Sequence, residues 1–283
     1  MKLACALLLL LLPNLRSLPG LSQVSDSSPV APGLPISRAP ESPIQDAAQR
    51  ALGELLQAQG LKLDVARGLL GVPVSVAIKH DLLEYLLVGP EGKGHESLFG
   101  SAVKPSLINA ALLALGAKAG QNAAWIEPTE EQPARLILPS GDGFYLYVAW
   151  RELDEVYLYR IEDVISNVLT GRSMRRHRWV YLGSRFASPR PGEPEVFVAD
   201  ATQNIINLSF FYSGNTLLTA ALPECQEQTI WTANSPLLPS TSENVQLIFS
   251  KQRLSALDAE WVSQLPRVEP SAPAPKTEAG DGH

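Results

Sequence analysis

Two neighbouring stretches decide the fold class, GLLGVPVSVAI at residues 68–78 and LLEYLLVG at residues 82–89. Both are rich in branched apolar residues, and in neither do the apolar side chains recur at helical spacing. Runs of this kind, bounded by glycine or by charge, are typical of β-strands. The polar residues Lys79, His80 and Asp81 separate the two runs. We therefore predict two strands joined by a polar turn.

Similar runs recur along the rest of the chain, which predicts a protein built largely from strands. They are ESLFGSAV (96–103), ARLILP (134–139), FYLYVAW (144–150), EVYLYR (155–160), RWVYLGS (178–184), EVFVAD (195–200), NIINLSFF (204–211), TLLTAAL (216–222) and NVQLIFS (244–250). Gly141, Asp142 and Gly143 tolerate a positive φ angle, so we expect a hairpin between residues 134–139 and 144–150.

Helical signals are confined to four segments. Ser42 and Gln45 form a capping box that begins a helix, and Gly60 ends it. Pro105 begins a second helix over residues 105–115, whose apolar face is predicted to be Leu107, Ile108, Ala111, Leu112 and Leu115. Shorter helices are expected over residues 162–170 and from Ser255 onwards. Mostly antiparallel strands with a few helices predict one α+β domain over residues 42–265.

The ends of the chain have a different composition. Residues 1–22 place Lys2 before an apolar run from Leu3 to Leu12, which is typical of a secretory signal peptide and too short to span a bilayer. We expect an exported protein, periplasmic or extracellular, without a transmembrane segment in the mature chain. Residues 23–41 are rich in serine and proline and predict a flexible linker, and residues 266–283 predict a disordered tail.

Charge and cysteine content exclude several functions. The formal net charge is −6, and it becomes more negative when Lys2 and Arg16 leave with the signal peptide. An acidic chain argues against nucleic-acid binding, which depends on a positive surface. After cleavage Cys225 is the only cysteine, so no intramolecular disulfide, CxxC zinc site, haem attachment or iron–sulfur ligand set can form. We predict no metal and no cofactor.

The polar stretch GKGHESLFG, residues 92–100, is the first candidate site. Gly92 and Gly94 allow a tight turn, and we interpret this stretch as mainly architectural, with His95 and Glu96 holding the helix that begins at Pro105. The alternative is a ligand site, because lysines near a helix start favour anions. The candidate ligand-binding residues are Lys93, His95, Glu96, Ser97 and Lys104.

A catalytic interpretation of the same region is also open. His80 could join His95 and Glu96 in a metal or acid–base site. The patterns HExxH and GxSxG are both absent from the sequence. His95 and Ser97 lie two residues apart, about 7 Å between Cα atoms in a strand, which is too far for a tight serine–histidine hydrogen bond.

The second candidate site is the run GRSMRRHRWVYLGSRFASPR at residues 171–190, which has six arginines and no acidic residue. A solvated loop and strand edge would explain it. A patch for an anion, such as an acidic polymer or a lipid headgroup, is the functional alternative. The candidate residues of that patch are Arg172, Arg175, Arg176 and Arg178.

Several stretches together resemble the YdjY-domain proteins of bacterial envelopes. The most specific are EYLLV (84–88), GKGHESLF (92–99) and KPSLINAALLALGAKAG (104–120), followed by RIEDVI (160–165), RWVYLGSRF (178–186), EVFVAD (195–200) and NSPLLPSTSENVQLIF (234–249). The resemblance covers residues 71–249 and implies an exported bacterial protein, but it supplies no catalytic residue. Two hypotheses follow: a non-catalytic module that binds an unknown ligand or envelope partner, or an enzyme with a site around His80, His95 and Glu96.

Overall fold

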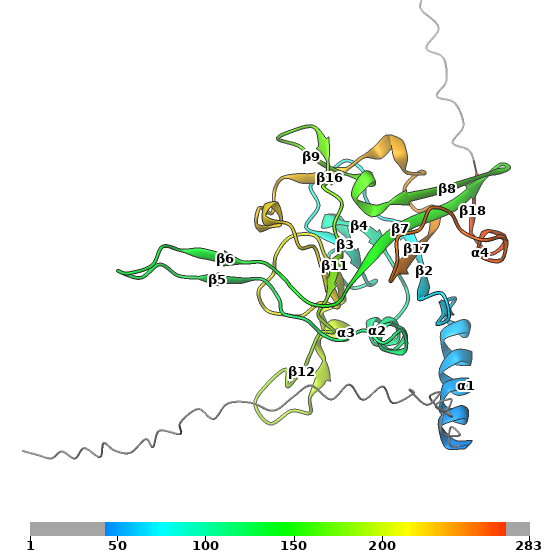
Figure 1. Ribbon diagram of the computed structural model, residues 1–283, viewed down its shortest axis with the longest axis horizontal. Coiled ribbons are helices and arrows are strands. Elements are labelled where there is room, and N and C mark those ends of the chain that lie inside the picture. Colours follow the sequence, from blue (N-terminus) through cyan, green and yellow to red (C-terminus); the bar gives the residue numbers. More distant parts are fainter. Residues whose placement is uncertain (1–42, 270–283) are drawn as a thin grey trace, which may run out of the picture. The chain divides into compact units, whose positions relative to one another are not determined.

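A computed structural model describes residues 43–269 of the chain (Figure 1). The predicted signal peptide at 1–22, the predicted linker at 23–41 and residues 270–283 of the predicted tail lie outside this part. The chain remains in the fold beyond Leu265, because strand β18 (Arg267–Val268) pairs in parallel with β7 (Gly143–Glu152).

Eight strands close into a β-barrel at the centre of the described part. In their order around the barrel they are β2 (Leu69–Val76), β17 (Asn244–Ser250), β7, β11 (Trp179–Tyr181), β15 (Leu218–Thr219), β14 (Asn204–Asn207), β3 (Tyr85–Val88) and β4 (Ser97–Gly100). The pairing of β4 with β2, at Val76 opposite Phe99, closes the ring. Parallel pairing occurs between β14 and β15 and between β3 and β4, and the other neighbours in the ring are antiparallel.

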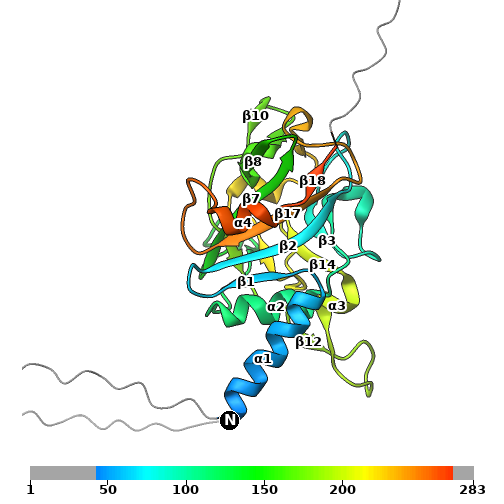
Figure 2. The same ribbon diagram turned by 90° about the vertical axis from the view of Figure 1, so that its right-hand side faces the viewer.

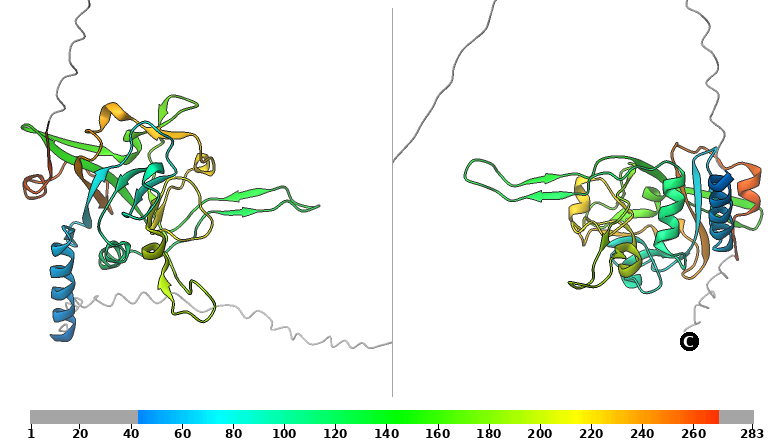
Figure 3. Two further views of the ribbon diagram at one scale, coloured as in Figure 1. Left: turned by 180° about the vertical axis from the view of Figure 1, so that it is seen from behind. Right: turned by 90° about the horizontal axis from the view of Figure 1, so that it is seen from below.

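The remaining strands are attached to the barrel or form small separate sheets. β1 (Lys62–Asp64) extends β2, and β8 (Glu155–Arg160) pairs with β7. β9 (Ile165–Asn167) lies between β10 (Arg172–Ser173) and β16 (Trp231–Ala233). Two hairpins project from the barrel, one formed by β5 (Ala124–Ile126) and β6 (Arg135–Ile137), the other by β12 (Phe186–Ala187) and β13 (Val196–Phe197), and Figure 3 shows them from two further sides.

The expected α+β class is wrong, because the described part is mostly β. Its α-helices are α1 (Pro43–Ala58), α2 (Pro105–Ala114), α3 (Val198–Thr202) and α4 (Ala259–Ser263). Figure 2 shows α1, α2 and α3 below β1 and β2. The strand runs were visible in the sequence, but the contact between β2 and β4 that makes a barrel of them is not local and leaves no periodic signal.

The side chains of β7 alternate between the two faces of the strand, and each face contacts a different hydrophobic cluster. Phe144, Leu146 and Val148 point into the main hydrophobic core. Tyr147 and Ala149 point the other way, into a second cluster that includes Trp261 of α4. Successive side chains of a strand alternate between its faces, so the tyrosines of β7 lie outside the main core. This outer face carries the candidate site described below.

Helix α2 confirms the predicted second helix and most of its buried face. Ile108, Ala111 and Leu112 are fully buried and Leu115 is nearly so, while Leu107 is half-buried against the core. The N-terminus of α2 is held by Asp200, whose carboxylate accepts a hydrogen bond of 2.8 Å from the backbone N–H of Ser106.

Three local predictions are wrong. The glycine-rich turn at residues 141–143 does not close a hairpin, because β6 pairs with β5 and the partners of β7 are other strands. The predicted helix at 162–170 is a short 3-10 turn, η2 (Ile161–Val164), followed by β9. The last helix begins at Ala259, where the Asp258 side chain caps it by accepting from the Trp261 N–H at 3.0 Å. In the first two cases a strand pairing outweighed the local pattern, and in the third the cap is Asp258 in place of Ser255.

Candidate functional site

The first five residues of the GKGHESLFG stretch form a turn between β3 and β4, and its last four residues are strand β4. His95 lies in the 3-10 turn η1 (Gly94–Glu96), and its side chain is 77% exposed. The Glu96 carboxylate lies 3.2 Å from the Lys93 ammonium and 3.6 Å from the His95 Nε2. Ser97 is fully buried, and its hydroxyl donates to the Phe99 carbonyl at 2.8 Å. Of the predicted ligand residues, the structure brings together Lys93, His95 and Glu96, whereas Ser97 has a structural role.

The predicted role of His95 and Glu96 in holding α2 is wrong. Their side chains contact one another, Lys93 and Glu84, whereas Asp200 of α3 holds the helix. Lys104, the fifth candidate, lies 4.0 Å from the Asp200 carboxylate and not beside His95 in the turn. A role in anchoring a helix requires a side chain directed inward, and an exposed histidine cannot supply it.

The structure does not support the proposed metal or acid–base site. His80 is exposed in the turn before β3. No group of three or more histidine, cysteine, aspartate or glutamate side chains arranged to hold a metal occurs between residues 43 and 269. His80, His95 and Glu96 are therefore not arranged to hold a metal together.

The predicted arginine patch is divided among different partners. Arg175 makes a bidentate pair with Glu224, at 2.8 and 2.7 Å, and Arg176 makes one with Asp163, at 3.0 and 2.7 Å. Arg172 is exposed in β10. Within residues 43–269, Arg178 has no carboxylate partner, and its guanidinium donates to the backbone carbonyl of Gly143.

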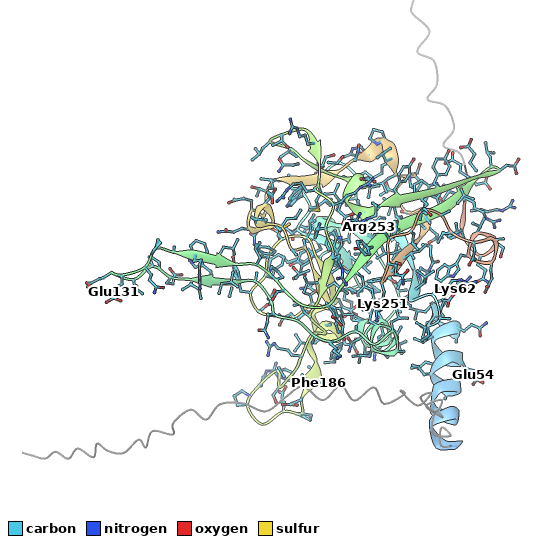
Figure 4. All side chains as sticks on the ribbon, in the orientation of Figure 1. Glu54, Lys62, Glu131, Phe186, Lys251 and Arg253 are labelled. Atoms are coloured by element: carbon cyan, nitrogen blue, oxygen red, sulfur yellow. The ribbon has the colours of Figure 1, made fainter. Side chains whose placement is uncertain are left out.

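A pocket of about 320 Å³ lies where Arg176 and Arg178 meet β7, and we call it the arginine–tyrosine pocket. Its lining residues are Tyr145, Tyr147, Arg160, Arg176, His177, Arg178, Arg253 and Leu254. In the view of Figure 4, Arg253 lies against the barrel strands, far from Glu131 at the tip of the β5–β6 hairpin.

The pocket forms where β7 changes its partner. Phe144 of β7 pairs with Trp179 of β11, whereas Tyr147 pairs with Arg160 at the end of β8. Tyr145 lies between these two pairings, where β11 and β8 diverge. The gap is bordered by the segment before β11, which carries Arg176 to Arg178, and by the segment after β17, which carries Arg253.

The phenol ring of Tyr145 forms a floor that three guanidinium groups approach. The distances from the ring centroid are 5.1 Å to Arg160, 5.7 Å to Arg178 and 5.7 Å to Arg253. Cation–π attraction over an aromatic ring contributes about 0.5–1 kcal/mol at an exposed site, which partly offsets the repulsion between like charges. The ring therefore holds together arginines that would otherwise repel each other.

A buried ion pair fixes one wall of the pocket. Glu162 is fully buried and accepts two hydrogen bonds from Arg160, at 2.9 and 2.7 Å. The same carboxylate accepts from the indole N–H of Trp179 at 3.1 Å. Arg160 also donates to the backbone carbonyl of His177 at 2.8 Å, so the pair ties the arginine segment to the end of β8.

The charge of the pocket is positive once the internal pairs are counted. Glu162 neutralises Arg160 and Asp163 neutralises Arg176. Neither Arg178 nor Arg253 has a carboxylate within 4 Å in the part of the chain that the structure describes. Arg253 therefore remains for an external anion, and Arg178 keeps its charge and one NH₂ group, because its Nε and its other NH₂ group donate to the Gly143 carbonyl.

His177 adds an unusual group to the same pocket. Its side chain is only 8% exposed and packs on Trp179, with the ring centroids 5.0 Å apart. The Nδ1 atom lies 3.1 Å from the Arg175 carbonyl oxygen, and the buried Nε2 atom has no hydrogen-bond partner among the described residues. Burial lowers the pKa of His177 below its ordinary value, although Glu162 opposes the shift. The imidazole is therefore neutral near pH 7.

Comparison with known proteins places this site in a family. The profile described as YdjY domain matches residues 61–250, about two thirds of the chain. The chain belongs to the YdjY domain family. No curated protein and no solved structure gave a match. The part of the chain that matches the YdjY domain contains the pocket residues from Tyr145 to Arg178 and stops three residues before Arg253.

Membership of the YdjY domain family confirms the resemblance seen in the sequence, but it assigns no ligand. No helix between residues 43 and 269 has the length and apolar character needed to cross a membrane.

Proposed function

We propose that this chain is an exported, non-catalytic binding module of the bacterial envelope, and that its arginine–tyrosine pocket takes an anionic ligand. The observation that carries the proposal is the pair of guanidinium groups, Arg178 and Arg253, both 5.7 Å from the centroid of the Tyr145 ring and without a carboxylate partner in the described residues. Arginine forks bind phosphate and carboxylate groups through paired hydrogen bonds, which favours an oxyanion as the ligand.

The size of the pocket limits the ligand. At about 320 Å³ it is at the lower end of the range for small-molecule sites. An inorganic oxyanion, a small anionic molecule or one charged unit of a polymer would fit this space. The aromatic floor formed by Tyr145 and Tyr147 would contact an apolar or sugar-like body beside the charged group.

The two carboxylates nearest the pocket favour binding over catalysis. The nearest carboxylates, those of Glu162 and Asp163, both accept hydrogen bonds from arginines and are held in these pairs. A general base must be free to take up a proton, and a carboxylate engaged by a guanidinium is a poor one. The guanidinium groups already lie around the Tyr145 ring, and this arrangement is suited to binding an anion.

Titration of inorganic phosphate into the purified protein tests the binding proposal. We expect saturable binding at low ionic strength that weakens as sodium chloride is added, because salt screens the attraction to partly exposed arginines. Calorimetry measures both quantities directly. Absence of binding to phosphate, sulfate and small carboxylates at low salt would contradict the proposal.

Export is the second part of the proposal, and the composition of residues 1–22 supports it. We expect the chain isolated from its native host to lack about the first 22 residues. Mass spectrometry of the intact protein measures this. A chain that keeps residues 1–22 in most molecules would overturn the proposed export.

A further inference from the structure

One residue that lines the arginine–tyrosine pocket has a buried hydrogen-bond acceptor without a partner among the described residues, beside the cationic donors, and this combination restricts the ligand further. The acceptor is the Nε2 atom of His177. An anion needs only donors around it, so an acceptor in the same pocket implies that the bound group also carries a hydrogen. The inference rests on the proposed anion-binding function and narrows its ligand class.

The protonation state of His177 follows from its contacts. A backbone carbonyl oxygen can only accept a hydrogen bond, so the 3.1 Å contact between Nδ1 and the Arg175 carbonyl requires the proton to be on Nδ1. The Glu162 carboxylate, 3.6 Å from Nδ1, favours the same tautomer. In a neutral imidazole the other nitrogen then has no proton and presents a lone pair.

This lone pair has no donor in the described structure. The Nε2 atom is buried and unpartnered, although His177 lines a pocket rich in arginine N–H groups. Arg160 is occupied by Glu162 and by the His177 carbonyl, and Arg176 is occupied by Asp163. A buried polar atom without a partner is costly, and a ligand that supplies the missing donor recovers that cost on binding.

We propose that the pocket selects oxyanions that carry a hydrogen-bond donor, as monohydrogen phosphate does, over oxyanions that carry none, and that His177 Nε2 is the acceptor that distinguishes them. In this arrangement Arg178 and Arg253 bind the charged oxygens while the O–H of the ligand donates to Nε2. Arg176, whose side chain is 62% exposed, and Arg178 border the histidine. Nε2 itself is buried, so the ligand reaches it when the Arg176 side chain leaves Asp163 or the Arg178 side chain leaves the Gly143 carbonyl, and exposed side chains can make such rotamer changes within nanoseconds.

Phosphate and sulfate provide a matched pair of probes. At about pH 8 inorganic phosphate is mainly the dianion with one proton, and sulfate is a dianion of similar shape with none. Methyl phosphate at the same pH is a phosphate monoester dianion, which has no proton left on its oxygens. If His177 accepts a hydrogen bond from the ligand, phosphate should bind about tenfold or more tightly than either of the other two.

The variant His177→Phe tests the role of the histidine, because it keeps an aromatic ring on Trp179 and removes both nitrogens. We expect this variant to bind phosphate, sulfate and methyl phosphate with equal affinity. His95→Phe is the matched control, since His95 is exposed in a turn outside the pocket, and it should keep the preference for phosphate.

The outcomes separate this inference from the proposed function. If the wild type binds all three anions with equal affinity, or binds methyl phosphate as tightly as it binds phosphate, the assignment of His177 is wrong while the anion pocket stands. If it binds none of them, the proposed function itself fails. Because the three-anion comparison is made on the wild type, it decides the question even if His177→Phe does not fold. A preference that survives in a folded His177→Phe protein would also overturn the inference.

Discussion

Replacing Glu162 by glutamine should lower the free energy of unfolding by about 3–5 kcal/mol, the cost of breaking a buried ion pair by removing one partner. Glu162 is fully buried and accepts two hydrogen bonds from Arg160 and one from Trp179. Glutamine has nearly the same shape but no charge, and its amide N–H₂ cannot accept from a guanidinium. Arg160, which is only 9% exposed, would then be left as a buried charge without compensation.

The matched control for this prediction is Glu224→Gln. Glu224 makes an equally short bidentate contact with Arg175, but the side chains of this pair are 63% and 37% exposed. Exposed pairs contribute about 0–1 kcal/mol, so the control should lose little stability. Urea denaturation of the three proteins measures the difference. Equal losses in the two variants would contradict the assigned role of Glu162 as the anchor of the arginine segment.

The sequence carried clear information about single elements. Strand β17 coincides with the predicted run at residues 244–250, and α2 begins at Pro105 as expected. These elements are long or have a distinct start signal, and local chemistry determines them. The α+β class was wrong because closure depends on Val76 meeting Phe99, and no residue near either one signals this contact.

The candidate site was predictable only in part. Arg176 and Arg178 belong to the patch that the sequence suggested, because a run of arginines without acidic residues is visible locally. Folding brings Asp163 to Arg176 and Glu224 to Arg175, and each carboxylate neutralises its arginine. Their carboxylates come from other segments, so the sequence overestimated the free charge of the patch.

For three further pocket residues, the sequence contained a weak indication of a site or none. Tyr145 and Tyr147 lie two residues apart in β7, a spacing that places both on one face and could have indicated an aromatic surface. Arg253 lies about 75 residues beyond Arg178 in the sequence, and only the pairing of β7 with β17 brings it near. The stretch GKGHESLFG gave a stronger sequence signal because its polar residues are adjacent, yet they mainly contact one another.

Replacing Arg178 and Arg253 together by glutamine should weaken anion binding about 100-fold or more. Hydrogen bonds to charged groups contribute about 1.5–3 kcal/mol each, and every 1.4 kcal/mol corresponds to a factor of ten in affinity. Glutamine keeps a polar side chain of moderate length but loses the charge and the fork geometry. The variant should still fold, because the loss of the Arg178 hydrogen bonds to the Gly143 carbonyl is partly offset by the removal of like charges around Tyr145.

Titration of inorganic phosphate tests most directly whether the arginine–tyrosine pocket is an anion site. Three proteins are compared: the wild type, the pocket variant Arg178→Gln/Arg253→Gln, and a control variant with the same change in net charge. Arg135→Gln/Arg190→Gln is that control, since both residues are exposed and lie outside the pocket. We predict that binding is saturable in the wild type, nearly unchanged in the control, and lost or weakened about 100-fold in the pocket variant. Equal weakening in the two double variants would show that phosphate responds only to net charge, and it would contradict a specific anion site at the arginine–tyrosine pocket.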